Sequence, residues 1–580
     1  METPLTVTNK INQFLNSRRG RNLREYLTAY LMLAPALTLI FIFGLFPVGF
    51  ALYVSIHKWR IIQSDFRGLE NYTSAVDSLA YIAIFLIGIG AVVGVFFLAR
   101  RIYREGRESK ENLWPLAIPG AFHAIATFAL FRWFFFQLPE FLDIANKMRG
   151  LERTRELFQR LLSEAFYAES VFPAWKQFAL LFIISVIVGV VASRFVKVEE
   201  NANYQSRFAI IWLALITGIG LINFTFQTIS EVYASAVVSG EDPGIWPQLI
   251  IVGSGFVLLG IAWKVWSSAE RQDTTWAFVL RIFAAIVLLV GAVILIIEVP
   301  TIVASGDEDL WNGLKVTVFF SLGTVPVQLT IALFLSVLLF QGVKGSEIFR
   351  VIYFLPYVTP AVASATVFRL MFSDRAAGPA NIVLGWLGIQ PQGWLRESDG
   401  ILTMLANAVG FDDFPASIVP NWFPEDFALL VADWLNGPSM ALMVVIMLSV
   451  WTFIGYNVVI YLAGLANIPN ELNEAAEIDG ASKWDIFRHI TFPLLSPTTY
   501  FLSLIAVMGT FKAFNTIWVM RQRVGSALGS MDTFSVLIFE EFFTKTRYGY
   551  ASALAFILFA IILMLTVVNN RIQGSRVFYG

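Results

Sequence analysis

Few residues of this chain could carry out covalent or metal chemistry. The 580 residues include no cysteine and three histidines, His57, His123 and His489. Thiol chemistry is therefore excluded, and a histidine-based metal site has little to draw on. We find no cluster of His, Asp or Glu at a catalytic or metal-binding spacing, and no Gly-x-x-x-x-Gly-Lys-Ser/Thr phosphate loop. The sequence predicts a protein that is not an enzyme and that needs neither a metal nor a cofactor.

The side chains best suited to specific binding lie inside two hydrophobic runs. Polar side chains within a membrane span are costly and usually face a cavity or a partner. Aromatic faces beside amide and hydroxyl groups suit a sugar, which has an apolar ring face and a rim of hydroxyls. We therefore expect a substrate pathway formed by Trp451, Gly455, Tyr456 and Asn457 in the first run and by Phe511, Lys512 and Asn515 in the second.

Lys512 admits two interpretations. In the first, its aliphatic stem extends to the membrane surface, or its ammonium group pairs with an acid on a partner subunit. In the second, the ammonium group contacts an anionic or hydroxylated substrate. The sequence leaves both open.

The composition indicates a helical membrane protein. Hydrophobic residues make up 57% of the chain and charged residues 14%, and the mean hydropathy is +0.68. Runs of about 20 apolar residues can cross a bilayer as helices. The formal net charge of -1 argues against a nucleic-acid partner. We predict an all-α, polytopic fold with about twelve spans, near 27–56, 79–99, 113–137, 175–196, 208–234, 246–266, 277–299, 313–340, 348–372, 439–465, 493–518 and 549–569.

The distribution of basic residues orients these spans. The N-terminal segment 1–26 and the connector 100–107 are rich in Lys and Arg, whereas the connectors at 240–243 and 306–309 are acidic or neutral. Basic connectors stay in the cytoplasm, so both termini are predicted to be cytoplasmic. Two outer connectors are long: 138–174 is predicted to form a surface helix, and 373–437 an ordered external cap.

A polar segment at 468–492 separates the tenth and eleventh spans and is predicted to be cytoplasmic. Asn470 is expected to cap a short helix, which the Asp479-Gly480 pair ends. Ser482 and Asp485 resemble a capping box for a second helix, and Pro493 suits the first turn of the next span. On these grounds alone, the segment could equally be a simple amphipathic connector.

The residues of this segment resemble the EAA coupling loop of binding-protein-dependent ABC importer permeases. The matching positions are Glu474, Ala475, Ala476, Asp479, Gly480, Ala481, Phe487, Ile490 and Pro493. The resemblance implies a type I permease fold, a dimer of ABC ATPase subunits that contacts this loop, a second homologous permease and an extracytoplasmic solute-binding protein. It also implies a multi-pass protein of the prokaryotic inner membrane.

The resemblance covers two blocks and points to carbohydrate permeases of the maltose-transporter kind. The first block, 27–75, includes Gly68-Leu69-Glu70-Asn71-Tyr72, and the second, 310–580, includes Trp311-Asn312-Gly313-Leu314. In the family these motifs lie close together. Here the region 76–309, with about six predicted spans, is inserted between them. An even number of spans keeps the coupling loop in the cytoplasm. The insert is either a lipid-facing or docking surface, or an added regulatory module.

An ion-coupled secondary transporter is the alternative function, because about twelve spans is a common number in that class. Such proteins often consist of two similar halves and bury acidic residues that couple transport to an ion. We find no half-repeat in this sequence, and its acidic residues lie mostly in the connectors. The ABC permease interpretation therefore accounts for more of the sequence.

Overall fold

The computed structural model describes residues 18–60, 63–152, 154–196, 201–240, 243–269, 275–341, 344–521 and 529–574. The chain forms two compact units, one built from Met1–Ala75 with Asp307–Gly580 and the other from Val76–Gly306. Ten helices of the described ranges are long and apolar enough to cross a membrane, or up to twelve if each of two bent pairs forms one span. The predicted polytopic helical class is confirmed.

The Val76–Gly306 unit consists of long helices that pack mainly in pairs. Helix α9 (Asn201–Ser239) packs against α5 (Leu79–Ser109) and α6 (Ala117–Lys147), and α8 (Val171–Phe195) also packs against α6. Helices α10 (Ile245–Ala269) and α11 (Thr275–Ser305) form a hairpin. The predicted surface helix is α7 (Arg155–Phe166), whose N-cap residue Thr154 accepts a hydrogen bond from the Leu157 amide. Residues 138–147, expected in that connector, instead extend α6.

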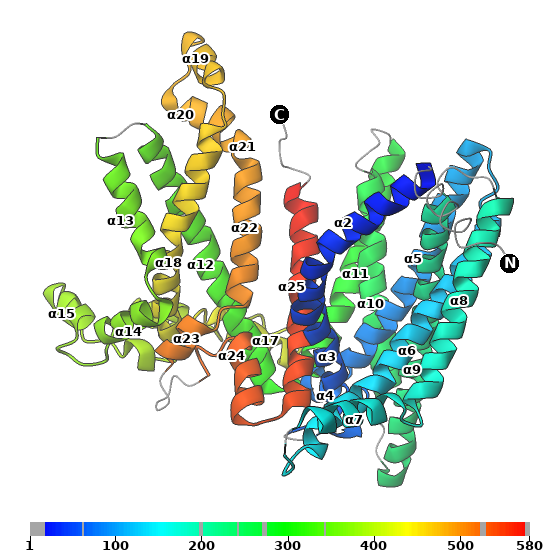
Figure 1. Ribbon diagram of the computed structural model, residues 1–580. Coiled ribbons are helices and arrows are strands. Elements are labelled where there is room, and N and C mark those ends of the chain that lie inside the picture. Colours follow the sequence, from blue (N-terminus) through cyan, green and yellow to red (C-terminus); the bar gives the residue numbers. More distant parts are fainter. Residues whose placement is uncertain are drawn as a thin grey trace, which may run out of the picture. The chain divides into compact units, whose positions relative to one another are not determined.

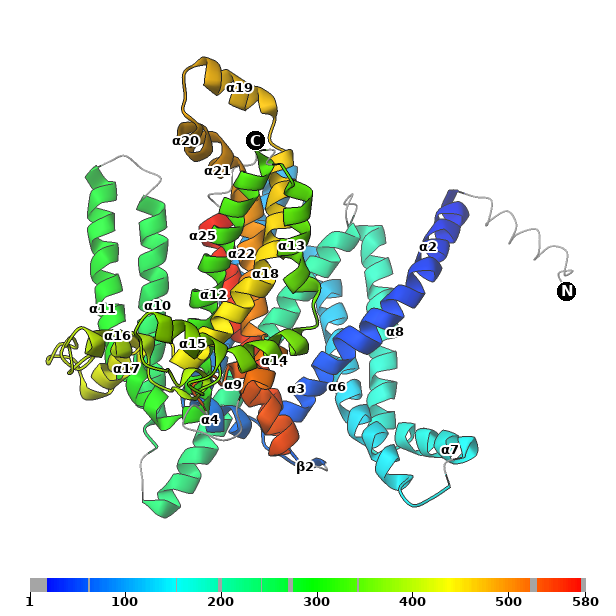
Figure 2. The same cartoon turned by 90° about the vertical axis from the view of Figure 1, so that its left-hand side faces the viewer.

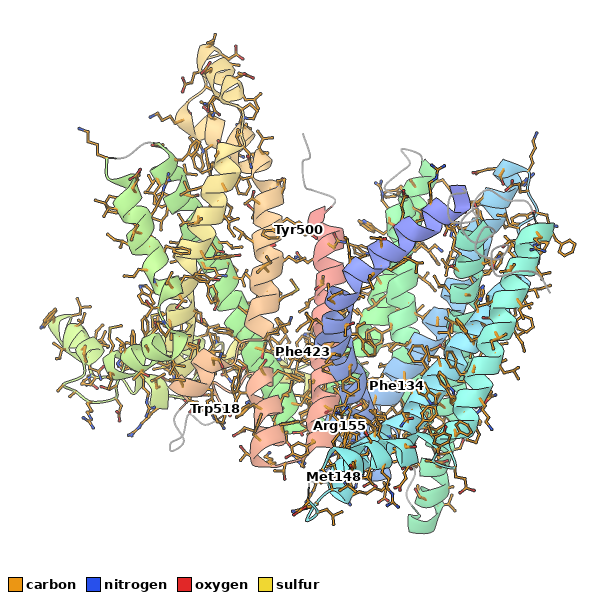
Figure 3. The ribbon with its side chains drawn as sticks, in the orientation of Figure 1. Phe134, Met148, Arg155, Phe423, Tyr500 and Trp518 are labelled. Carbon is orange, nitrogen blue, oxygen red and sulfur yellow. The ribbon has the colours of Figure 1, made fainter. Side chains whose placement is uncertain are left out.

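The other unit is organised around three long helices. Helix α12 (Glu308–Phe340) packs against α18 (Met440–Ala466) and α22 (Ser496–Phe511). Helix α25 (Tyr548–Gly574) lies beside α22 (Figure 1). Tyr500 of α22 donates a hydrogen bond of 2.9 Å to the Asn570 side chain of α25 and is labelled between the two helices in Figure 3.

The N-terminal part of this unit begins with α2 (Arg18–Ile40), a π-helical turn at Phe41–Leu45 and α3 (Phe46–Ser55). A short antiparallel sheet then pairs β1 (His57–Trp59) with β2 (Gln63–Phe66), so the fold is not purely α. The Asn71 side chain of α4 (Glu70–Val76) donates hydrogen bonds to the carbonyls of Ser55 and His57. These bonds fasten the sheet to the end of α3, and α3 in turn packs against α25.

Two of the predicted spans are broken. The span expected at 348–372 consists of α13 (Ser346–Val358) and α14 (Ala361–Met371), which meet at an angle of 93°. Pro360 lies at this break and accounts for it. Proline ends a helix and disfavours helical backbone in the residue before it, here Thr359. The span expected at 493–518 stops at Phe511, and a separate helix, α23 (Asn515–Met520), follows. The second bent pair lies at the start of this span, where Lys483–Leu494 and Ser496–Phe511 meet at 60°.

The connector between α14 and α18 is ordered, as expected of an external cap. It contains α15 (Pro379–Trp386), a short 3-10 turn at Trp394–Arg396, α16 (Ile401–Ala408) and α17 (Glu425–Leu435). Asn381 is buried and holds this connector together, because its side chain bonds to the carbonyls of Ser373 and Arg375 and to the indole nitrogen of Trp394. After Met520, the chain continues through α24 (Phe534–Phe539) and a π-helical turn at Glu540–Thr544 to α25.

Candidate functional site

The 468–492 segment projects beyond the ends of the bundle helices (Figures 1 and 2). It contains α19 (Asn470–Ile478), α20 (Lys483–Ile486) and a π-helical turn at Phe487–Thr491 that leads into α21 (Phe492–Leu494). Glu474, Ala475, Asp479 and Gly480 are exposed, and Ala476, Ala481, Phe487, Ile490 and Pro493 are half-buried. Small exposed residues on a projecting helix pair leave room for a partner to approach.

Two local features fix the shape of this segment. Gly480 has a φ of +81°, the left-handed conformation that glycine adopts without strain. Ser482 and Asp485 form the predicted capping box, with each side chain bonded to the backbone N–H of the other residue. The prediction that Asn470 caps α19 is wrong, because Asn470 is already helical and the N-cap residue is Pro469. The helix therefore begins without a side-chain cap.

A cavity of about 380 Å³, here called the central cavity, lies among α12, α18 and α22. Its lining includes four of the predicted pathway residues: Tyr456, Asn457, Lys512 and Asn515. Tyr357 from α13 also lines it and stacks on Tyr456, with ring centroids 4.9 Å apart. The break between α22 and α23 matters here, because it directs residues 512–516 of the chain along the cavity wall.

Three deeply buried polar groups line the central cavity without a hydrogen-bond partner. They are Thr324 Oγ1, Gln328 Oε1 and Asn457 Nδ2, and their residues are 1%, 3% and 3% exposed. A buried polar group without a partner costs about 1–3 kcal/mol. Three such groups around one cavity are therefore suited to bind a ligand that carries hydroxyl groups.

The remaining predicted pathway residues do not line the central cavity. Gly455 packs against the α13 backbone so closely that a Cβ atom there would lie 1.8 Å from the Tyr353 carbonyl oxygen. Trp451 packs on Phe368 at 5.5 Å between ring centroids, and Phe511 belongs to the buried core. Sequence reasoning missed Thr324, Gln328 and Ser449. The signal available for the first two was their spacing of four residues inside an apolar run, which places them on one helix face.

A cluster of charged residues lies near α23. Arg521 forms ion pairs with Asp532 at 2.9 Å and with Glu540 at 2.6 Å, and its guanidinium group lies 5.5 Å from the Trp518 ring. Burial raises the pKa of Asp532 to about 6 even though Arg521 acts in the opposite direction. This cluster ties the end of α23 to the residues on both sides of α24 (Phe534–Phe539), because Asp532 precedes that helix and Glu540 follows it. Across the described ranges, no group of three or more His, Cys, Asp or Glu residues could hold a metal ion.

Comparison with known families identifies the class of protein. Residues 328–576 match the model of the family described as binding-protein-dependent transport system inner membrane component. The matched region contains the 468–492 segment and most of the helices that line the central cavity. Together with the relatives below, this match shows that the chain belongs to that family, whose members are multi-pass inner-membrane transport subunits.

Individual relatives agree with this assignment. The chain is 31% identical over 276 residues to the probable ABC transporter permease protein YesP of Bacillus subtilis (strain 168), an alignment covering 47% of this chain and 76% of that protein. It is 28% identical over 267 residues to the arabinooligosaccharides transport system permease protein AraP of the same strain, covering 46% and 71%. It is also 30% identical over 276 residues to the sn-glycerol-3-phosphate transport system permease protein UgpA of Agrobacterium fabrum (strain C58 / ATCC 33970), covering 47% and 79%.

Proposed function

We propose that this chain is the transmembrane permease subunit of an ATP-driven importer and that its solute is a carbohydrate. The observation that carries the substrate class is the central cavity, where Thr324, Gln328 and Asn457 offer buried polar atoms beside the rings of Tyr357 and Tyr456. A sugar presents hydroxyls to the first group and an apolar ring face to the second. Two relatives support this proposal: YesP is named as a probable ABC transporter permease, and AraP as a permease for arabinooligosaccharides.

ATP hydrolysis is proposed to come from a dimer of separate ABC ATPase subunits that contacts the 468–492 segment on the cytoplasmic side. The contact residues are proposed to be Glu474, Ala475, Ala476, Asp479, Gly480, Ala481, Phe487, Ile490 and Pro493. A second homologous permease and an extracytoplasmic binding protein that delivers the solute complete the assembly. The family's dependence on a binding protein supports the last of these partners.

The connectivity suggests how this contact moves the solute site. Helix α18 runs directly into the 468–492 segment, and α21 and α22 leave it. Both α18 and α22 line the central cavity. A displacement of the segment by the ATPase therefore acts on two walls of the cavity at once. The capping box and the Gly480 turn keep the segment stiff enough to transmit that displacement.

We propose that the chain comprises a cytoplasmic N-terminal segment (1–26), a first permease span with an external segment (27–75), an inserted membrane region (76–309) and the permease core (310–580). The core carries the external cap and the coupling segment. The division of the structure into units at Ala75 and Asp307 supports an insert that folds as a separate body. Such a body is suited to a docking or regulatory role and leaves the permease core intact.

A phosphate-bearing solute is the second candidate. Lys512 lines the central cavity, and no described residue of its lining carries a carboxylate. Lys512 is exposed and its ammonium group would attract an anion, and one relative, UgpA, is named for sn-glycerol-3-phosphate transport. This candidate differs from the first in the charge of the solute, and a competition assay separates them.

The first test is affinity purification of the tagged chain from its native membrane, followed by identification of the proteins that accompany it. We expect an ABC ATPase and a second permease with the wild type. Gly480→Asp should lose the ATPase, because a side chain at a φ of +81° strains the turn. Gly410→Asp is the matched control, since Gly410 has a φ of +91° in the external cap, and it should retain the ATPase. Uptake that proceeds in proteoliposomes on an ion gradient alone would overturn the proposal.

The second test addresses the solute. Asn515→Leu should impair uptake of a neutral oligosaccharide while the ATPase still copurifies, because Asn515 lines the central cavity and is separated from the 468–492 segment by α22. Competition by glycerol 3-phosphate but not by neutral sugars would favour the second candidate. Unchanged uptake kinetics in Asn515→Leu would remove this residue from the site.

A further inference from the structure

A second cavity, of about 480 Å³, lies where the external connector meets the start of α12, and we call it the cap cavity. Its walls come from the Glu308–Phe319 part of α12, from residues 398–403 and 433–442, and from Gly529 and Ser530. Hydrogen bonds fix these walls: Thr403 donates to the Asn436 side chain at 2.9 Å, and Asn312 donates to the Gly529 carbonyl at 2.7 Å. The cavity is therefore part of the ordered structure of the connector.

One ridge of α12 lines both cavities. Side chains four residues apart form a continuous row along a helix. In this row Glu308, Asn312 and Val316 line the cap cavity, and Phe320, Thr324 and Gln328 line the central cavity. A solute that leaves the cap cavity along this row arrives at Thr324 and Gln328, two of the three residues with partnerless polar groups.

A buried apolar layer separates the two cavities. Val316 and Phe320 of α12 pack with Val445 and Ile446 of α18 in one core cluster, and each of these residues is at most 4% exposed. On α18 this pair lies between Leu442, which lines the cap cavity, and Ser449, which lines the central cavity. In this conformation the apolar layer blocks passage of a solute from the cap cavity to the central cavity.

The charges of the cap cavity define the solute it accepts. Its lining carries three carboxylates, Glu308, Asp399 and Asp433, and one ammonium group, Lys315. Lys315 lies 2.8 Å from both carboxylate oxygens of Asp433 and is thereby compensated. The other two carboxylates, Glu308 and Asp399, belong to exposed residues and remain as acceptors for hydroxyl donors. Their charge disfavours an anion, with a strength that falls as the salt concentration rises. Phe319, which packs on Trp434 at 5.3 Å between ring centroids, supplies an aromatic wall.

We propose that the cap cavity is a second solute-binding site that receives a neutral, hydroxyl-rich carbohydrate before it reaches the central cavity, and that rejects anionic solutes. The inference rests on the proposed carbohydrate function and adds a site and a charge selectivity to it. The selectivity originates in the cap cavity, because the described lining of the central cavity carries Lys512 and no acid.

The absence of cysteine from the chain makes the test direct. Single cysteines are introduced into the full chain in nanodiscs at Ser398 in the cap cavity, at Ala513 in the central cavity and at the exposed Ser417 of the same connector as a matched control. The rate of reaction with a maleimide is measured with maltotriose, arabinotriose or lactose as neutral probes and with trigalacturonate as the anionic probe. Elution from a sizing column checks that each variant is folded.

We expect a neutral probe at four times its Kd to slow labelling of Ser398→Cys by about fivefold, following simple mass action. The same probe should leave Ser417→Cys unchanged, and trigalacturonate should protect neither position. Protection of Ala513→Cys alone would overturn this inference and leave the carbohydrate function standing. If trigalacturonate protected Ser398→Cys as strongly as a neutral probe does, the proposed charge selectivity would be overturned. Protection at neither cavity by any neutral probe would overturn both proposals together.

Discussion

Polar side chains of the Val76–Gly306 unit form a bonded network around the buried Gln205, whereas three buried polar groups of the other unit surround a cavity. In the first unit, Gln205 bonds to His123, to the Gly189 carbonyl and to Ser193, each at 3.2 Å. Arg207 pairs with Glu105 at 2.5 Å. In the second unit, Thr324, Gln328 and Asn457 have no partner and line the central cavity. Satisfied networks hold helices together, whereas unsatisfied groups around a cavity indicate a ligand site.

The sharpest test of this difference is Asn457→Leu. Uptake should fall by up to about 100-fold, since a lost hydrogen bond to a buried group amounts to about 1–3 kcal/mol. Thermal stability should stay the same or increase, because the variant removes a partnerless buried amide. Transport assays and a melting curve measure the two effects. A loss of stability together with uptake would mean that Asn457 has a structural role, as Gln205 has in the other unit.

The cluster of Arg521, Asp532 and Glu540 extends the comparison to charged groups. The cost of burying the Asp532 carboxylate is only partly offset by its ion pair with Arg521. Asp532 faces Arg521, Glu540 and Asp309, and burial raises its pKa from 3.8 to about 6. Because the folded protein binds this proton more tightly than the unfolded chain does, the contribution of Asp532 to stability is fully present below about pH 4 and is lost as the pH rises through about 6.

This loss amounts to about 2 kcal/mol after partial solvent screening, since each tenfold difference in proton affinity corresponds to about 1.4 kcal/mol. Asp532→Asn should flatten the dependence of the melting temperature on pH in the range from about 4 to about 7, where the unfolded and folded forms of Asp532 titrate. Asp412→Asn, at an exposed position in the connector between α14 and α18, should leave the dependence as in the wild type. An unchanged slope in Asp532→Asn would show that other groups carry it.

Gln205→Leu should have the reverse effect of Asn457→Leu. It leaves His123, Ser193 and the Gly189 carbonyl without one partner each, so stability should fall by about 1–2 kcal/mol. The KM for the solute should not change, because no solute contact is expected in this unit. Thermal unfolding and uptake kinetics on the same preparation measure both. A raised KM would indicate that the insert contributes to solute binding.

The smallest expected effect concerns α7. Thr154→Ala removes the side-chain oxygen that accepts from the Leu157 amide at 3.2 Å and should cost about 1 kcal/mol of local helix stability. Hydrogen exchange at the start of α7 measures it. Ser163→Ala, at an exposed position within the same helix, should leave exchange there unchanged. Uptake should be unaffected by both, and a transport defect in Thr154→Ala would assign α7 a functional role.

The sequence alone determined the class of the protein and much of the 468–492 segment. Long apolar runs must form helices in a bilayer, because each backbone group has to be bonded within its own segment. The Gly480 turn and the capping box between Ser482 and Asp485 follow from contacts within four residues, which local chemistry fixes. Asn470 was misplaced because the start of a helix shifts by a residue or two without much cost.

Tertiary structure decided which polar residues share a cavity. Hydropathy shows that α22 and the following residues are apolar, but the break at 512–514 that directs Lys512 and Asn515 into the central cavity depends on packing against other helices. Gly455 was assigned to the pathway from its position, whereas its backbone contact with Tyr353 reveals a packing role. Thr324 and Gln328 join the site because α12 meets α18 and α22, a contact between residues more than a hundred positions apart that no local pattern specifies.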